Sequence, residues 1–268
     1  MGEIPGINPD AKKPKELRPA QAEMLTPFGD EFFIKNVEDG QDVKIGTGGS
    51  SGIRDMFVRC DFSSFKKTLD LVSTKKFDEL FNAVGELKKD APELDDATRK
   101  LLHACWRVAR MTRNLLGEVA EGKNMARQKS FVEHATTTTD GKNVSIRPLS
   151  ESKGTSMCAE YALMSQQVLK RAGIESAVVV GTFSEDPEDP VTEAHTYLVV
   201  DNGKYVFDPT HSALQTNSWP PKVILAETPL TLETLRNMEP DPEKSFGKKI
   251  NCTDLLSNEI RMYGTGAT

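Results

Sequence analysis

Apolar residues recur at helical spacing from about residue 62 to residue 121. In the stretch "FDELFNAVGELKK", which begins at Phe77, they fall at positions i, i+3, i+4, i+7 and i+10, the spacing of one helix face. A longer helix is predicted from about Pro92 through "ELDDATRKLLHACWRVARMTRNLLGEVAEG", because proline suits a first helical turn. Its apolar stripe contains Leu102, Cys105, Ala109, Leu116 and Val119, so Cys105 is expected in the core.

In the second half of the chain, short runs rich in Val, Tyr and Phe predict strands. One more helix, "CAEYALMSQQVLKRAG", is expected to end at Gly173. The strands "SAVVVGTF", "HTYLVV" and "KYVFD" follow it, and the last two are joined by Asp201-Asn202-Gly203. Two short helices, "TLETLRNM" and "CTDLLSNEIRMYG", are expected later. Helices first and an antiparallel sheet afterwards predict the α+β class, with a helical N-terminal half packed on the sheet.

A change in composition near residue 60 suggests the domain organisation. Residues 1–60 are rich in proline, glycine and charge, and we expect a flexible or weakly structured N-terminal arm with one strand around "FFIKNV". Residues 61–268 are expected to form one domain. Within it, residues 122–152 contain clusters of Gly, Thr and Asn and are expected to be a loop with short strands.

Charge and hydropathy limit the classes of partner. The chain has 268 residues, is 37% hydrophobic and carries a net charge of −6 that is spread along its length. This charge gives no basic surface for nucleic acid or for an anionic membrane. No apolar run approaches the roughly 18 residues that span a bilayer, and the N-terminus lacks the apolar core of a secretory signal. We therefore expect a cytoplasmic protein that binds neither nucleic acid nor membrane.

The four cysteines (Cys60, Cys105, Cys158 and Cys252) are irregularly spaced and form no CxxC pair. Neither a zinc knuckle nor a disulfide framework is therefore indicated, and free thiols are expected. We expect no metal and no cofactor. A zinc site made from Cys158, His195, Asp208 and His211 is an alternative, since all four residue types bind zinc, but their spacing matches no metal motif.

The hairpin around Asn202-Gly203 predicts which side chains meet. Asn-Gly favours a tight turn, and facing residue numbers then sum to 405, so Tyr197 faces Asp208. His195 lies two residues earlier on the same face, about 7–8 Å diagonally from Asp208 at the backbone. An imidazole and a carboxylate can meet over that distance. The opposite face (Thr196, Leu198, Val200, Tyr205 and Phe207) is mostly apolar and is expected to face the core.

Cys158 is predicted in the first turn of its helix, with Thr155 or Ser156 as the N-cap. There the helix dipole favours a thiolate, and the unpaired N–H groups of the turn can stabilise an oxyanion. A cysteine, a histidine and an aspartate are also the nucleophile, base and orienting group of acyl transfer. Each residue alone favours a structural role, and only their order and local geometry together favour catalysis. His211 is an alternative base.

The segment from residue 154 to residue 212, "GTSMCAEYALMSQQVLKRAGIESAVVVGTF…EAHTYLVVDNGKYVFDPTHS", resembles the transglutaminase-like cysteine enzymes. The resemblance implies a papain-like α+β fold for the domain 61–268, with Cys158 as nucleophile, His195 as base and Asp208 as orienting residue. It also implies an oxyanion-hole side chain upstream of Cys158, for which Gln128 is the candidate. Tyr197 stands where the family often has Trp.

The resemblance implies acyl-enzyme chemistry on an amide of a protein or peptide substrate. The expected function is therefore that of a cysteine-dependent amide hydrolase or acyltransferase, of the peptidase or deamidase type. A non-catalytic transglutaminase-like binding or scaffold domain is the alternative, and transfer from acetyl-coenzyme A is a further one. Only two tryptophans are present, Trp106 and Trp219, so aromatic walls for an amine acceptor are scarce and hydrolysis is favoured over transamidation.

Overall fold

The computed structural model describes residues 24–27, 33–46, 52–72, 95–117, 124–184, 193–210, 222–226, 228–237 and 247–249. The predicted helices at 77–89 and 252–264 lie outside these residues. The strands are β1 (Met24–Pro27), β2 (Phe33–Ile34), β3 (Asp42–Gly46), β4 (Asp55–Arg59), β5 (Ala135–Thr137), β6 (Asn143–Pro148), β7 (Ser176–Ser184), β8 (Glu193–Val200), β9 (Tyr205–Asp208), β10 (Lys222–Ala226) and β11 (Gly247–Lys249). The helices are η3 (Phe62–Phe65), α1 (Lys66–Leu69), α3 (Asp96–Leu116), α4 (Asn124–Glu133), η4 (Leu149–Glu151), α5 (Cys158–Arg171) and α6 (Leu232–Asn237).

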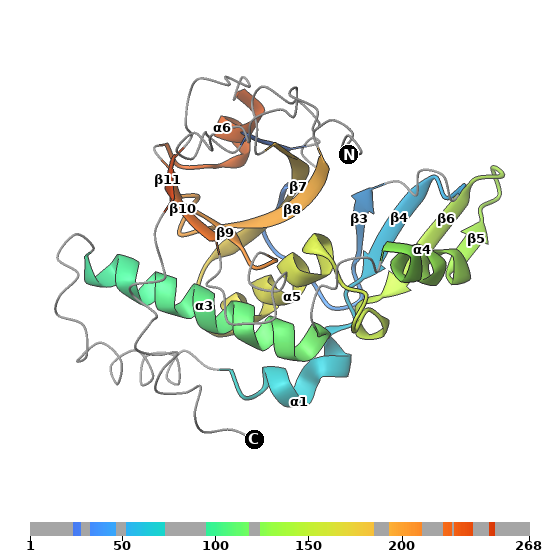
Figure 1. Ribbon diagram of the computed structural model, residues 1–268, viewed down its shortest axis with the longest axis horizontal. Helices are drawn as coiled ribbons and strands as arrows, with labels where there is room; N and C mark the ends of the chain where they lie inside the picture. The colour runs from blue at the N-terminus through green and yellow to red at the C-terminus, as the bar shows by residue number, and fades with distance from the viewer. Residues whose placement is uncertain are drawn as a thin grey trace, which may run out of the picture.

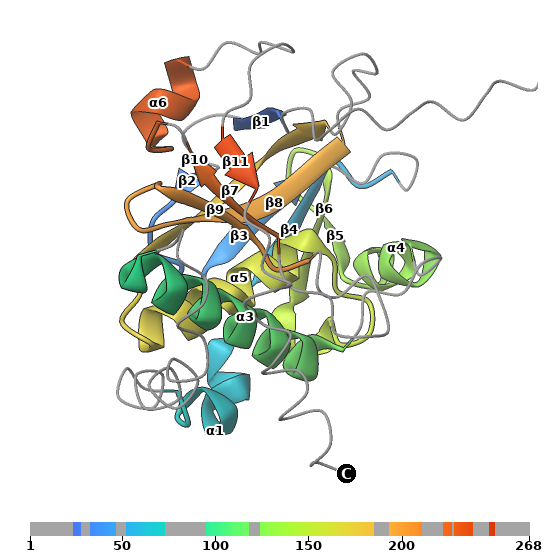
Figure 2. The same ribbon diagram turned by 60° about the vertical axis from the view of Figure 1, so that its left-hand side comes forward.

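The larger of two sheets is antiparallel and contains seven strands. Its order is β1-β7-β8-β9-β10-β11, and β2 also pairs with β7. Helices α3 and α5 lie side by side beneath it, and α5 contacts both β7 and β8 (Figures 1 and 2). The protein is therefore a mixed helix-and-sheet structure of the α+β class with an antiparallel sheet, as the sequence predicts.

The second sheet has four strands in the order β3-β4-β6-β5. Strands β4 and β6 pair in parallel, while β3 with β4 and β5 with β6 pair antiparallel. Helix α4 packs beside β6 (Figure 1). This helix falls in the stretch 122–152, where the sequence predicts a loop with short strands, so that prediction is wrong for residues 124–133.

The described part of residues 1–60 is folded into the protein. Strands β3 and β4 belong to the second sheet, and the side chains of Val37, Val43, Val58 and Cys60 are buried in the main core. This differs from the expectation of a flexible or weakly structured arm. Within the described residues 33–37 of the expected strand around "FFIKNV", β2 takes up Phe33 and Ile34. A hydrogen bond to α5 holds the residues that follow β2. There, the Gln166 side chain of α5 accepts a hydrogen bond from the Val37 backbone N–H at 3.0 Å.

Both faces of the larger sheet are covered. The main core gathers residues of α3, α5 and both sheets, and it includes Leu198, Val200, Tyr205 and Phe207 from the hairpin face predicted to be apolar. Cys105 of α3 is fully buried in this core, as predicted. A smaller core on the opposite face contains Ala177, Val179, Tyr197, Val199, Val206, Ala226, Leu230 and Leu235. Within the parts of the chain that the structure describes, no helix has the length and apolar character needed to cross a membrane.

Candidate active site

Cys158 is the first residue of α5 and is partly exposed, whereas Cys60 and Cys105 are buried. Its place in the first turn agrees with the prediction, but the predicted N-cap does not. Met157, in an extended conformation, occupies the N-cap position. The Thr155 and Ser156 hydroxyls instead donate to the Ser152 carbonyl at 3.1 and 2.8 Å, so they stabilise the turn that precedes the helix.

The β8–β9 hairpin has the predicted register. Leu198 faces Phe207 and Val200 faces Tyr205, so facing residue numbers sum to 405. The turn between the strands has four residues, from Asp201 to Lys204, and the Lys204 backbone N–H donates to the Asp201 carbonyl at 3.0 Å. A four-residue turn gives the same sum as a two-residue turn at Asn202-Gly203. Asp201, Asn202 and Gly203 all have positive φ, which Asn and Gly tolerate best. The hairpin therefore places His195 and Asp208 on one face, at its open end.

His195 and Asp208 are in direct contact. The His195 Nε2 atom lies 2.9 Å from Asp208 Oδ2, and both side chains are largely buried. The other carboxylate oxygen, Oδ1, accepts a hydrogen bond from the Thr210 backbone N–H at 2.9 Å. Cys158 lies near His195, which is the main group that lowers the pKa of its thiol. Because Nε2 faces the carboxylate, Nδ1 is the ring nitrogen that remains for the thiol. The structure thus brings the three predicted residues together.

The electrostatics of this chain favour a charged pair. Burial by itself would raise the pKa of the Cys158 thiol, but the hydrogen bond and charge of His195 and the charge of Arg127 lower it below its ordinary value. Burial disfavours the imidazolium, yet the Asp208 carboxylate and the Cys158 sulfur raise the pKa of His195 to about 11. Both shifts favour a thiolate beside an imidazolium, which is the activated form of a cysteine nucleophile.

The other candidates from the sequence lie elsewhere. Gln128 is exposed on α4, and its neighbour Arg127, rather than Gln128 itself, contacts the segment that leads into α5. The oxyanion role of Gln128 stays a prediction without a supporting contact. His211 lies outside the described residues. Among the residues that are described, no three His, Cys, Asp or Glu side chains are arranged to hold a metal ion.

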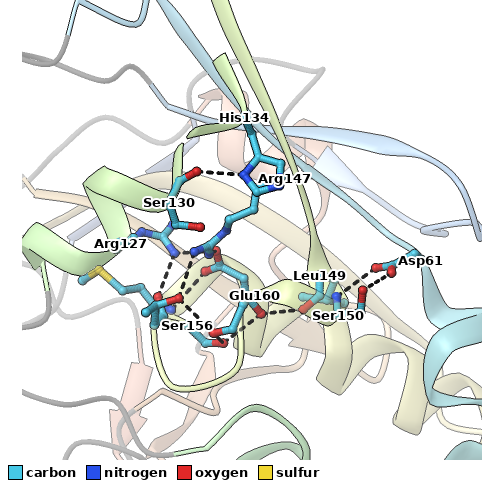
Figure 3. Close-up of polar contacts among 12 residues, drawn as sticks. Asp61, Arg127, Ser130, His134, Arg147, Leu149, Ser150, Ser156 and Glu160 are labelled. Atoms are coloured by element: carbon cyan, nitrogen blue, oxygen red, sulfur yellow. Dashed lines mark hydrogen bonds and ion pairs between the residues drawn. The ribbon is translucent and has the colours of Figure 1, made fainter. Parts of the chain in front are cut away.

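Three charged residues beside the site were missed by sequence reasoning. Glu160, the third residue of α5, is fully buried and contacts both Arg127 and Arg147 (Figure 3). A glutamate three residues after the N-cap is a known helix-start pattern, but that pattern expects Ser or Thr as the cap, and here the cap is Met157. Nothing in the sequence spacing indicates that the two arginines meet Glu160, because Arg127 belongs to α4 and Arg147 belongs to β6.

A comparison of the chain with protein-family models, curated proteins and solved structures found no match. The functional proposal therefore depends on the site geometry and on the sequence pattern. That geometry combines a thiol whose pKa is lowered, a histidine that can donate and accept a proton, and the N-terminal turn of a helix. The first N–H groups of a helix lack acceptors within the helix, so they can donate to an oxyanion that forms beside Cys158. Together these groups can carry out nucleophilic acyl chemistry.

Proposed function

We propose that the protein is a cysteine-dependent amide hydrolase or acyltransferase that acts on a protein or peptide through a thioester acyl-enzyme. The observation that carries the proposal is the contact of His195 with Asp208 beside Cys158, the first residue of α5, whose pKa His195 lowers. A helix that begins with the cysteine and an antiparallel pair that supplies histidine and aspartate are also what a papain- or transglutaminase-like fold would have. That finer description of the fold is part of the proposal.

In the proposed acylation, the Cys158 thiolate attacks the substrate carbonyl carbon, and the carbonyl oxygen becomes an oxyanion beside the first turn of α5. When the tetrahedral intermediate collapses, the carbon–nitrogen bond breaks and the leaving amine takes a proton from the His195 imidazolium. The products are the free amine and a Cys158 thioester. Asp208 accepts a hydrogen bond from the imidazole throughout, so the ring keeps its orientation and tautomer.

In the proposed deacylation, neutral His195 removes a proton from a water molecule that attacks the thioester carbon. The carbon–sulfur bond then breaks, a carboxylic acid leaves, and the thiolate–imidazolium pair is restored. An amine in place of water would give a new amide by the same steps. Hydrolysis and transfer therefore share the acyl-enzyme and differ only in the acceptor.

The test is to trap the acyl-enzyme. The purified protein is mixed with an activated acyl ester, quenched in acid, and analysed by intact mass and by peptide mapping. We expect one acyl group on Cys158, and no such adduct in Cys158→Ala or in His195→Ala. His134→Ala is the matched control, because the His134 Nε2 atom lies 3.1 Å from Glu151 Oε2, outside the site, and its loss should leave the adduct unchanged.

Acylation that persists in His195→Ala at the wild-type rate would contradict the proposal. So would acylation that is spread over several cysteines. A Cys158 that accepts no acyl group, in a protein that is otherwise folded, would favour a binding or scaffold domain instead.

A further inference from the structure

A buried group of charges lies directly beneath the turn that carries Cys158. We call the side chains of Arg127, Arg147 and Glu160 the ionic cluster. Glu160 lies two residues after Cys158, and its Oε1 atom contacts both guanidinium groups. Its Oε2 atom accepts a hydrogen bond from the Met157 backbone N–H at 3.0 Å. The Glu160 carboxylate therefore joins the start of α5 to both arginines (Figure 3).

The arginines also hold the segment before the helix. Arg147 donates to the Thr155 hydroxyl at 3.0 Å, and Arg127 donates to the Thr155 carbonyl at 3.4 Å. Both guanidinium groups lie over the ring of buried Phe131, with centroid distances of 5.0 Å for Arg127 and 4.4 Å for Arg147. The segment from Thr155 to Glu160, which includes the nucleophile, is thus held at its two ends and at Met157.

The cluster links α5 to the second sheet. Arg147 belongs to β6, and Arg127 belongs to α4. These two elements are themselves joined, because the Ser145 hydroxyl donates to the Phe131 carbonyl at 2.6 Å. Helix α5 thus carries Cys158, the larger sheet carries His195, and the second sheet and α4 hold the turn that presents the thiol.

The composition of the cluster is poor for stability alone. Buried ion pairs cost desolvation that their attraction often fails to repay, and apolar replacements are frequently neutral or stabilising. Here two cations share one carboxylate, so the cluster has a net charge of +1. Among the described residues, the buried Arg147 Nε atom has no hydrogen-bond partner. An excess positive charge is nevertheless favourable next to a thiolate.

We propose that Arg127, Arg147 and Glu160 are positioning residues that hold the first turn of α5 so that the Cys158 thiolate faces His195. The inference deepens the proposed function and depends on it. Arg127 acts in two ways, because it holds the Thr155 carbonyl and its charge also lowers the pKa of Cys158. Glu160 acts by position alone, since its own negative charge opposes the thiolate.

At Glu160 the two effects on the pKa of Cys158 are opposite, because the negative charge raises this pKa and the proposed positioning role lowers it. Substitution of Glu160 therefore separates the two effects. The measurement is the rate of Cys158 alkylation by iodoacetamide as a function of pH, with the site of labelling mapped by mass spectrometry. Arg127→Met should raise the midpoint of the profile by about one pH unit and slow alkylation at neutral pH about tenfold. Arg127→Lys, which keeps the charge, should recover part of that shift.

In Glu160→Gln, loss of a negative charge would by itself lower the midpoint. The amide has one acceptor oxygen instead of two, so it cannot hold both the Met157 N–H and the two arginines, and this loss of position should raise the midpoint. We expect the midpoint to rise.

Arg171→Met is the matched control, because Arg171 forms an ion pair with Asp70 at the other end of α5. Its profile should equal that of the wild type. Circular dichroism checks the fold of each variant. If Arg127→Met or Glu160→Gln does not fold, Thr155→Val, which removes the hydroxyl that contacts Arg147 and the Ser152 carbonyl, should give a smaller rise.

Two failures are distinguishable. If wild-type Cys158 reacts no faster than Cys105, the proposed function itself is contradicted. If wild-type Cys158 is fast, and the folded variants of the ionic cluster keep the wild-type midpoint, the positioning role is overturned and the proposed function stands. A midpoint that falls in Glu160→Gln would also overturn the positioning role, since charge alone would then account for the effect.

Discussion

The Nε2 atom of His195 lies 2.9 Å from the Oδ2 atom of Asp208, although the two residues are on different strands and 13 positions apart. They are diagonal neighbours across the β8–β9 hairpin, so the contact follows from the register of that hairpin. The carboxylate is the main group that favours the imidazolium form of His195, and the imidazolium in turn favours the thiolate form of Cys158.

Replacing Asp208 by Asn should therefore change the pH profile of Cys158. Without the carboxylate, the pKa of His195 falls, the imidazolium loses population, and the pKa of Cys158 rises toward the value of about 8.5 for a free thiol. Alkylation at neutral pH should slow about tenfold or more, and the midpoint of its pH profile should move upward. The measurement is the rate of iodoacetamide labelling at Cys158 over a pH series.

The matched control for this change is Asp201→Asn, at the closed end of the same hairpin. Asp201 is exposed and has a positive φ that Asn tolerates at least as well, so its variant should keep the wild-type profile. An unchanged midpoint in a folded Asp208→Asn variant would show that the carboxylate does not determine the state of the thiol.

The hairpin could be predicted from the sequence because its determinants are local. Asn202-Gly203 fixes the turn, alternation fixes the faces, and together they place His195 near Asp208. The second sheet could not be predicted in the same way. Its β4 strand pairs in parallel with β6, about ninety residues later, and such a pairing has no turn that marks it in the sequence.

Charged contacts between elements that are distant in the sequence could not be predicted either. Arg127, Arg147 and Glu160 occur in three separate elements, and nothing in their spacing indicates that they meet. The cap of α5 was predicted as Thr155 or Ser156 because hydroxyls favour that position. Here both hydroxyls bond Ser152 instead, and the Glu160 side chain bonds the N-cap backbone N–H. The buried Glu160 side chain thus bonds the start of α5, and neither hydroxyl residue occupies the N-cap position.

Gly203 should be sensitive to a methyl group. A Cβ added there would lie 2.4 Å from the Leu230 carbonyl oxygen, and its φ of +84° is already unfavourable for other residues. Gly141 is the matched control, because it has a φ of +76° but no atom within 4 Å of the added Cβ. Gly203→Ala should cost more unfolding free energy than Gly141→Ala, by about 1–3 kcal/mol. Denaturant unfolding of both variants measures the difference, and equal losses would contradict the close packing of the hairpin turn on Leu230.

Residues 24–50 should contribute substantially to stability. They supply β3 and the buried side chains of Val37, Val43 and Ile45, and full burial of such a side chain contributes about 1.5–3 kcal/mol. Deleting residues 1–50 should therefore lower the unfolding midpoint strongly or prevent folding. The comparison is a deletion of residues 1–23, which removes none of the described elements. Equal thermal midpoints for the two truncations would restore the interpretation of this region as a weakly structured arm.

The acceptor for the acyl group should be water. A transamidase needs a cleft that excludes water and admits an amine, and aromatic side chains are the usual walls of such a cleft. Trp106 is buried in α3, where the guanidinium groups of Arg107 and Arg110 lie near its ring, and Tyr197 is buried in the smaller core. Neither side chain can therefore form an exposed wall beside Cys158, and Trp219 lies outside the described residues.

If the proposed function holds, we therefore expect hydrolysis to dominate when the protein is incubated with a protein substrate and an excess of a primary amine. Mass spectrometry of the products should show new carboxyl groups far more often than incorporated amine. His195→Ala should yield neither product, and His134→Ala should give the wild-type ratio, which ties both products to the site. Predominant incorporation of the amine would contradict the prediction, and it would mean that the acyl-enzyme is shielded from water by groups other than Trp106 and Tyr197.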